Sequence, residues 1–443
     1  MGLFDRLFGS GGKKEVQPKI PFGRYTDSYK TQQQYDAWDL SLEEFEKGNY
    51  MESYRLFFKY LRDDTCNNVQ VEEANGQINF QLIQGSKKIA GFVNNKKVSI
   101  GSKVVKTDDL NIGFMRRLME ENYKMEYGRF ALDEENDIAI VFNTYVLDGS
   151  PYKLYYALKE VATKADKMDD LLIEEFSVLH QTDESLLEEI GIEEKETKYA
   201  FLKRNIEEAL NEIDNGKIKQ EKYPGAFAYL LLNLSYKLDY LILPEGHLME
   251  TLERIHRLYF SQDGKNHLQK NGILYKEFKK LLTRPKEEYF KEMYRVTKTF
   301  GITKPVTHDR VVSFIDGELH NMDWYNQNGY DHIAIAIPGY IVGYCMFNFA
   351  VPRPDRELFH LYYQIVESHY FKGLGYTLNY YDREKKSFDK KAIKRAISDI
   401  VENNAALYDR MKPDKNLLQF DTLTNFAKSF LLMVKKLDLT KIA

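Results

Sequence analysis

The amino-acid sequence predicts an α+β protein, with antiparallel sheets covered by helices and a helical region in the middle of the chain. Residues 71–107 alternate apolar and polar side chains, as half-buried strands do. Residues 182–300 carry apolar side chains at every third or fourth position, as amphipathic helices do. Strand-like runs return after residue 301. Because 443 residues are many for one core, we expect several domains.

Residues 1–24 are expected to form a flexible segment rich in glycine and lysine. A frayed terminus is the plainer interpretation of its first residues. The alternative is one short amphipathic turn that makes peripheral contact with a partner or a membrane surface through Leu3, Phe4, Leu7 and Phe8.

Residues 25–64 predict a helical hairpin, because apolar residues recur every three or four positions on both sides of GNY. The junction resembles the turn of a tetratricopeptide repeat, with Gly48 at the bend, Tyr50 packing back and Ser53 allowing close helix approach. Such repeats need about three copies to bury their faces. Since one copy is found, we expect the hairpin to cap the neighbouring domain.

Residues 65–181 predict a compact α+β domain. The runs QINFQLIQ, KKIAGFVN and KKVSIGSKVVK indicate a β-meander. A helix over NIGFMRRLMEENYKM, a strand pair over YGRFALD and DIAIVFNTYV, and a long helix from Ser150 complete the predicted order.

Residues 301–443 predict a second α+β domain with two closing helices, and its strands are expected in RVVSFIDG, HIAIAIPG, YIVGYCMFNFAV and YTLNYYD. VFNTYVLDGSPYKLYYALKEV also aligns without gaps with MFNFAVPRPDRELFHLYYQIV, which pairs Phe142 with Phe347 and Asn143 with Asn348. The second domain is therefore expected to be a diverged copy of the first, unless two generic strand-to-helix units match by chance.

Composition limits the classes of partner. The net charge of −4 with mixed signs predicts no binding to nucleic acid. Two cysteines exclude a disulfide framework and favour a cytoplasmic location, and no signal peptide is expected. The 32 tyrosines and 27 phenylalanines suit protein interfaces. No integral membrane segment is predicted, since residues 226–243 suit a buried helix and residues 332–351 suit two strands joined by a turn.

The long helix from Ser150 carries the main candidate site. Its predicted apolar stripe comprises Leu154, Leu158, Val161, Ala165, Met168, Leu172, Phe176 and Leu179. Asp166, Asp170 and Glu174 follow at four-residue steps on another face. We expect these acids to form an exposed row. A metal site is the alternative, but no second carboxylate-rich element accompanies the row, and Lys164 and Lys167 supply local counter-charge.

No other motif points to catalysis. LDEEND, residues 132–137, has calcium-like acids but suits a charged hairpin tip. Gly373 and Gly375 follow a helix and precede a strand, which is the reverse of a phosphate-binding loop. Cys345 is expected to be a buried, unreactive thiol. We therefore predict no catalytic, metal-binding or cofactor-binding residue and no enzyme, although a metal- or nucleotide-dependent activity is the remaining alternative.

With these residues in view, the region from Tyr50 to Leu179 resembles the YbjN family, whose fold is like the bacterial type III secretion chaperones of the CesT kind. The resemblance lies in the order sheet, helix, hairpin, helix and in RRLMEENYKMEYGRFALDEENDIAIVFNTYVLDGSPYKLYYALKEVATKADKMDDLL. Ala165 and Asp166 occupy the place where those chaperones set a small residue and an aspartate. The resemblance covers about a third of the chain and implies a non-enzymatic, chaperone-like adaptor or regulator that binds a protein client and dimerises through a helix.

Two functional hypotheses follow. In the first, a partner docks on Tyr155, Tyr156 and the acidic row, or adds a strand along QINFQLIQ or YGRFALD if either lies at a sheet edge. In the second, the chain is a helical-repeat-type scaffold subunit of a larger bacterial assembly, and its central helices carry the interface.

Overall fold

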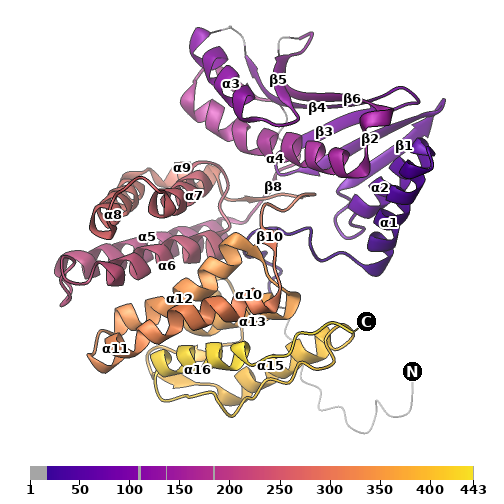
Figure 1. Cartoon of the computed structure of the whole chain (residues 1–443). Coiled ribbons are helices and arrows are strands. Elements are labelled where there is room, and N and C mark those ends of the chain that lie inside the picture. The colour runs from indigo at the N-terminus through magenta and orange to yellow at the C-terminus, as the bar shows by residue number, and fades with distance from the viewer. Residues whose placement is uncertain (1–16, 108–110, 136, 183–184, 443) are drawn as a thin grey trace.

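The computed structural model describes residues 17–107, 111–135, 137–182 and 185–442. It confirms the α+β class. An antiparallel sheet with its helices forms the upper part of the molecule in Figure 1, and a larger helical part lies below it. The predicted amphipathic turn of residues 3–8 lies outside the described residues.

The predicted helical hairpin is present as α1 (Gln32–Glu46) and α2 (Tyr50–Leu61). Gly48 lies at the bend with φ +82°, a conformation that glycine adopts without steric cost. The Tyr50 ring packs against Phe45 with 5.1 Å between centroids, and Ser41 and Ser53 exchange hydrogen bonds between the two helices. The side chains of α2 enter the core beneath the sheet, so the hairpin caps that domain as predicted.

A sheet with the order β1-β2-β3-β4-β6-β5 forms the first domain, and β7 extends it by pairing with β4. All its pairs are antiparallel, and the strands are β1 (Val69–Ala74), β2 (Gln77–Gln84), β3 (Lys87–Val93), β4 (Lys97–Thr107), β5 (Arg129–Leu132), β6 (Ile138–Tyr145) and β7 (Leu179–Gln181). The three predicted meander strands are β2, β3 and β4, and the predicted strand pair and its preceding helix are β5, β6 and α3 (Ile112–Lys124), whereas β1 and β7 were not predicted.

One face of this sheet is buried and the other is wet. Along β2, Ile78, Phe80 and Leu82 are buried, while Asn79 and Gln81 between them are exposed. The buried face is covered by α4 (Pro151–Glu175), which lies across the sheet in Figure 1. Its predicted apolar stripe is buried in the same core as the strands through Leu172, but the helix ends at Glu175, so Phe176 follows it and Leu179 lies in β7. Burial of that stripe is the main force that fixes α4 on the sheet.

The middle of the chain is helical, as predicted. It contains α5 (Ile192–Asn215), α6 (Pro224–Ile242), α7 (Gly246–Phe260), α8 (His267–Thr283) and α9 (Lys286–Lys291), together with the short paired strands β8 (Glu188–Glu189) and β9 (Tyr294–Arg295). Helix α6 is buried on nearly all sides, which confirms a buried helix over residues 226–242.

The C-terminal third differs from the prediction. RVVSFIDG lies in α10 (His308–Glu318), and HIAIAIPG with YIVGYCMFN forms the single helix α12 (Asp331–Asn348). The remaining elements are η3 (Leu319–Asn321), α11 (Met322–Gln327), α13 (Arg353–Val366), α14 (Ser368–Gly373), α15 (Lys390–Asn404), α16 (Leu423–Lys435) and four two-residue strands, β10 (Lys304–Pro305), β11 (Phe349–Ala350), β12 (Tyr381–Asp382) and β13 (Ser387–Phe388).

The predicted second copy of the sheet domain is therefore wrong. Phe142 and Asn143 lie in strand β6, whereas their aligned counterparts Phe347 and Asn348 lie at the end of helix α12. The predicted strand YTLNYYD is reduced to the two residues of β12. What the two aligned segments share is a helix that begins at a proline-containing turn, which is a common local arrangement.

Two clusters of buried side chains hold the chain together. One lies between the sheet and helices α2, α3 and α4, and the other runs through α5–α8 into α10–α16. The middle and C-terminal regions thus share one core, which we call the helical half. Residues 17–24, expected to be flexible, are held against it: Phe22 is buried, the Gly23 amide donates to the Tyr240 carbonyl, and Arg24 forms an ion pair with Asp239 at 2.8 Å.

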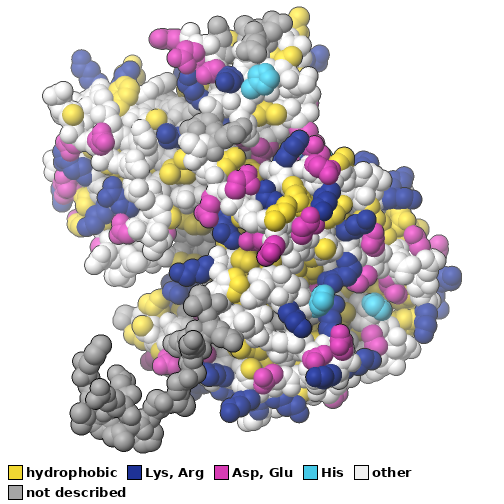
Figure 2. All heavy atoms as spheres, turned by 180° about the vertical axis from the view of Figure 1, so that it is seen from behind, with side chains coloured by type: hydrophobic (Ala, Val, Ile, Leu, Met, Phe, Trp, Pro, Cys, Tyr) yellow, Lys and Arg dark blue, Asp and Glu magenta, His cyan; other side chains and the backbone are white. Residues whose placement is uncertain are grey.

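Among the described residues, no helix combines the length and apolar character needed to cross a bilayer. Lysine, arginine, aspartate and glutamate side chains are intermingled on the face that Figure 2 shows. That distribution agrees with the mixed charge of the sequence.

Candidate functional site around helix α4

The start of α4 exposes large apolar side chains. The Ser150 hydroxyl accepts the Lys153 amide and Pro151 occupies the first turn, so the helix begins sharply after the 3₁₀ turn η2 (Val146–Asp148). Four side chains around this turn are exposed, which we call the aromatic face: Tyr145 (72% exposed), Leu147 (71%), Tyr152 (54%) and Tyr156 (53%).

The two tyrosines singled out from the sequence have different surroundings. Tyr156 belongs to the aromatic face, whereas Tyr155 is half-buried and donates its hydroxyl to Asp27 at 2.7 Å. Burial, followed by the charge of Asp27, raises the pKa of Tyr155 well above its ordinary value. The Tyr155 ring also packs near Trp38 and Phe300. Tyr155 therefore ties α4 to Trp38 of the hairpin, to Asp27 and to Phe300, and Tyr156 remains available to a partner.

Two cavities lie near this region, and their linings include Tyr155 and Val146 but none of the four side chains of the aromatic face. The cavity of about 530 Å³ lies between the sheet domain and the helical half, and its walls include Tyr29, Tyr35, Tyr60, Tyr155 and Tyr408. The other, of about 460 Å³, is lined by the hairpin turn and by Val146. Volumes of this size accept side chains or small ligands.

The acidic row is not an exposed face. Asp166 is half-buried and accepts the Ser86 amide at 2.9 Å. Gly85 beside it has φ +58°, and a Cβ there would lie 1.7 Å from the Asp166 carboxylate. Burial, opposed by Lys298 and assisted by Glu245, raises the pKa of Asp166 to about 7. The prediction of exposure is wrong because the β2–β3 turn and residues 245–298 cover this face of α4.

Asp170 and Glu174 continue toward the helical half. The Tyr294 hydroxyl lies 3.4 Å from Asp170, and burial together with Asp169 and Asp166 raises the pKa of Asp170 to about 8. Glu174 alone is exposed, and its carboxylate contacts His247 Nδ1 at 2.9 Å. All three acids therefore line a contact within the chain. Of the three carboxylates, that of Glu174 is the most accessible to a partner.

Lys164 and Lys167 do not neutralise the acidic row, contrary to the prediction. Lys164 pairs with Glu121 of α3 at 2.5 Å, and Lys167 pairs with Glu250 and Glu253 of α7 at 2.5 and 2.7 Å. The counter-charge for the buried acids comes from elsewhere. Lys87 lies 2.8 Å from Asp169, and Lys298 acts on Asp166.

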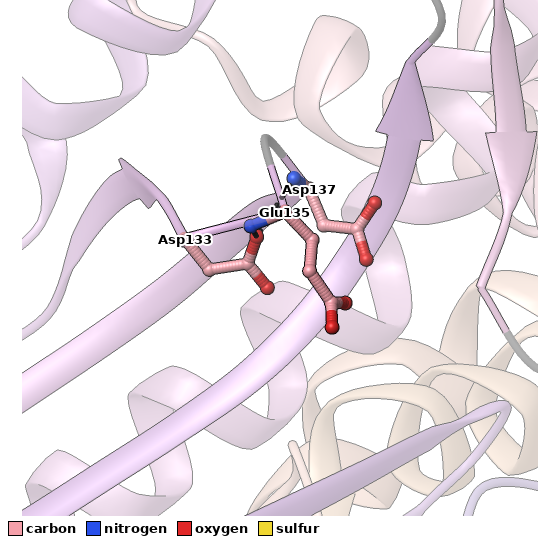
Figure 3. Close-up of side chains that lie close together, drawn as sticks. All are labelled: Asp133, Glu135 and Asp137. Atoms are coloured by element: carbon pink, nitrogen blue, oxygen red, sulfur yellow. Dashed lines mark hydrogen bonds between the residues drawn. The ribbon is translucent and has the colours of Figure 1, made fainter.

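Asp133, Glu134, Glu135 and Asp137 lie between β5 and β6, where the charged hairpin tip was predicted. Figure 3 shows the carboxylates of Asp133, Glu135 and Asp137 close together at this tip. Lys103 of β4 places its ammonium group 3.0, 2.5 and 2.9 Å from the three. A lysine charge therefore lies where a bound cation would compete for the same oxygens.

The strand order shows which of the two segments considered for strand addition lies at an edge of the sheet. QINFQLIQ is β2, which has neighbours on both sides, while YGRFALD is the edge strand β5. The side chain of Asn122 bonds both the amide (2.6 Å) and the carbonyl (3.3 Å) of Phe130 in β5. Because an edge strand offers its outward backbone groups to an incoming strand, Asn122 blocks this edge. The opposite edge, β1, was not singled out from the sequence.

Sequence reasoning missed Tyr145, Leu147 and Tyr152. Tyr152 lies four residues before Tyr156, so the helical periodicity that located the acidic row would have found it. The exposure of Tyr145 and Leu147 depends on where β6 ends, which the sequence does not define.

Four lysines border the aromatic face. Lys97 pairs in register with Tyr145, Lys96 accepts the Val146 amide through its carbonyl, and the ammonium group of Lys153 bonds the Thr144 hydroxyl at 3.1 Å. Lys159 lies 5.6 Å from the Tyr155 ring centroid. Among the described residues, none of these four ammonium groups forms an ion pair. One exposed carboxylate, Asp148, lies in the same stretch.

Comparison with models of known protein families and with curated proteins gives no match for this chain.

Proposed function

We propose that the chain is a non-enzymatic protein-binding protein, an adaptor or regulator of the YbjN type, and that a partner docks on the aromatic face. The observation that carries the proposal is the exposure of Tyr145, Leu147, Tyr152 and Tyr156 within a single turn region of the sheet domain. Isolated exposed apolar residues are ordinary. Exposed tyrosines gathered in one region are typical of the anchor positions of protein interfaces.

The charges around the face favour a partner segment with apolar side chains flanked by carboxylates. The four bordering lysines form no ion pair among the described residues, whereas of the nearby exposed acids Asp148 and Glu52, Glu52 is already paired with Arg55. Complementary charge of this kind mainly raises the rate of association and the specificity of binding.

The alternative scaffold role of the central helices has less support. Their apolar faces are used inside the core of the helical half, as the burial of α6 illustrates. The larger apolar side chains that they expose include Ile192, Phe260 and Leu268, each 39–60% exposed.

Surface substitutions test the proposal better than deletions. Removing residues 182–300 would remove part of a core shared with residues 301–437, so loss of binding would report unfolding. We therefore compare Tyr152→Ser/Tyr156→Ser with Tyr123→Ser, whose tyrosine is 93% exposed on α3.

The double variant is expected to lose partner binding by roughly tenfold or more, because truncating a central aromatic anchor typically costs over about 1 kcal/mol. Partner retention on the tagged chain, quantified after purification from the cell that produces it, provides the readout, and thermal melting confirms folding. Tyr123→Ser should retain the partner. Equal retention by all three proteins would exclude the aromatic face as the interface.

A further inference from the structure

The helical half carries an open groove that is lined by residues 20–29, α13 and α15. Its volume is about 720 Å³. Helices α13 and α15 pack against each other in the lower part of Figure 1, and residues 20–29 are bonded to α13 through Arg356. None of the four side chains of the aromatic face lines the groove. It is therefore a second surface, separate from the aromatic face.

Apolar side chains cover part of the groove. Four that line it are only partly buried, so that an occupant can touch them: Ile20, Tyr25, Ala396 and Ile400. The His360 ring also lines the groove and packs 5.1 Å from the Phe22 ring. Burial, followed by the charge of Arg356, lowers the pKa of His360 to about 4, so this ring is neutral at neutral pH. This part of the lining suits an apolar occupant.

Two charged groups of the groove lack counter-ions among the described residues. Arg356 donates from Nη2 to the Phe22 carbonyl at 3.2 Å but forms no ion pair with a described residue. Asp399 of α15 is exposed and forms none either. The other charged groups of the lining, Arg353 and Glu357, bond each other at 2.9 Å. One cation and one anion are thus left for an occupant.

Neighbouring charges do not neutralise these two groups. Asp355 precedes Arg356 in the sequence, but it is buried and its carboxylate contacts His308 Nδ1 at 2.9 Å. Arg395 lies one helical turn before Asp399 on α15 and forms no ion pair with it.

Residues 3–8, LFDRLF, carry side chains that match this lining. On one helical turn, Leu3, Phe4, Leu7 and Phe8 form the apolar stripe expected from the sequence. At 3.6 residues per turn, Asp5 and Arg6 fall on opposite sides of that stripe. The segment therefore offers one acid and one base beside an apolar face, which complements Arg356, Asp399 and the apolar lining.

The same segment is tethered beside the groove. Gln17 is held to the helical half, since its side chain donates to the Thr377 hydroxyl at 2.5 Å and accepts the Thr377 amide at 3.2 Å. Ile20, three residues later, lines the groove. Residues 9–16 connect the stripe to Gln17 and include three glycines. A flexible connection of this length spans about 16 Å on average, which is enough to bring residues 3–8 to the groove.

We propose that residues 3–8 dock in this groove of their own chain. Their apolar stripe packs on the partly buried side chains of the lining, Asp5 accepts from Arg356, and Arg6 donates to Asp399. The tether gives the segment an effective concentration on the order of millimolar, so weak contacts suffice to keep the groove occupied. The docked segment shields the groove until a competing segment displaces it. This contact does not depend on the proposed role of the aromatic face.

Photocrosslinking within the purified full chain tests the docking. A photoreactive phenylalanine analogue replaces Phe4, and mass spectrometry of the digested protein locates the crosslink. We expect a crosslink within one chain to residues 20–29, α13 or α15. The same analogue at Tyr25, which lines the groove, confirms that groove peptides are detected. Crosslinks from position 4 between two copies of the chain, crosslinks to other regions, or none at all would overturn the proposal.

A charge swap tests the assigned ion pair with the same readout. Arg6→Asp should lower the yield of the crosslink several-fold, because it places an acid against Asp399. Arg6→Asp/Asp399→Arg should restore the yield. Arg6→Asp/Glu384→Arg is the matched control and should not restore it, since Glu384 is exposed in the helical half outside the groove. Equal yields from the parent and Arg6→Asp, or equal recovery by both double variants, would show that Arg6 does not contact Asp399.

Discussion

Lys87 and Asp169 show how a single residue pair holds the sheet domain together. Their side chains are 2% and 0% exposed and their charges lie 2.8 Å apart. Lys87 also donates to the Val104 carbonyl at 2.8 Å, and the Ser86 hydroxyl donates to Asp169 at 2.6 Å. The network is satisfied, so its members depend on one another.

Removing one member should leave a charge buried without its partner. We expect Lys87→Met to lower the free energy of unfolding by about 3–5 kcal/mol. Lys87→Met/Asp169→Leu should recover most of that loss, because an apolar pair needs no solvation. Urea titration of the two variants measures both values. A double variant as unstable as the single one would show that the other bonds of Asp169, rather than the ion pair, stabilise this region.

At the residue scale, sequence reasoning identified α4 but not the environment of its side chains. The helical periodicity placed Asp166 and Asp170 off the apolar stripe, which is where they lie. It could not show that residues 245–298, far along the chain, cover that face. Tyr155 and Tyr156 were indistinguishable as neighbours in the sequence, yet Tyr155 bonds Asp27 and Tyr156 is 53% exposed.

The element whose prediction failed most clearly is α12. Its run of Ile, Val and Ala is buried on nearly all sides, so it has no polar face and no helical periodicity to detect. Pro338 and Gly339 suggested a turn, since proline removes a helix hydrogen bond and glycine weakens a helix. Packing against α6 and α16 outweighs these local preferences. In α10, Val311 and Ile315 are buried one turn apart, a helical spacing that the sequence did display.

Helix α12 should be sensitive to small additions where it meets α6. We expect Gly343→Ala to destabilise the helical half by about 1–3 kcal/mol, because its Cβ would lie 2.6 Å from Tyr236. Gly317→Ala in α10 is the matched control, since nothing lies within 4 Å of its Cβ and alanine favours helix. Thermal denaturation compares them. Equal melting temperatures for the two variants would contradict the close packing of α12.

The contact between α4 and residues 245–298 should depend on pH. The pKa values of Asp166 and Asp170 rise to about 7 and about 8 in the folded chain, from an ordinary 3.8. The folded state therefore binds more protons than the unfolded state between pH 4 and 8. Their contribution to stability is fully present below pH 4 and is lost as the pH rises through 7 and 8, at up to about 1.4 kcal/mol per pH unit for each proton.

Asp170→Asn should remove part of this dependence. The variant should gain stability relative to the parent chain as the pH rises from 5.5 to 8.5, because its amide carries no charge to bury. Glu175→Gln is the control, since Glu175 is exposed at the end of α4 and pairs with Arg117 rather than with a histidine. Melting temperatures of the three proteins across this range give the comparison. A constant difference between Asp170→Asn and the parent would mean that Asp170 is already ionised throughout.

For the whole molecule, the sequence predicted the α+β class and the order of the longer elements from β2 to α9, but not the strands β1, β7, β8 and β9. Alternation along β2 and the periodicity of α4 are local patterns, and each is preserved in the fold. The sharing of one core by residues 190–437 is a long-range property, set by which buried faces meet. Local patterns do not reveal that these residues share a core. The second sheet domain was therefore predicted in a region that belongs to the helical half.

The central claim is that a protein partner docks on the aromatic face, and site-specific photocrosslinking tests it most directly. A photoreactive phenylalanine analogue replaces Tyr156 in the cell that produces the protein, and in a matched strain it replaces Tyr123 on α3, which is also exposed. The account predicts a discrete crosslinked partner from position 156 that is absent from position 123, and the purified partner should then bind the parent chain and lose affinity for Tyr152→Ser/Tyr156→Ser. No crosslinked protein at position 156, or the same products from both positions, would contradict it.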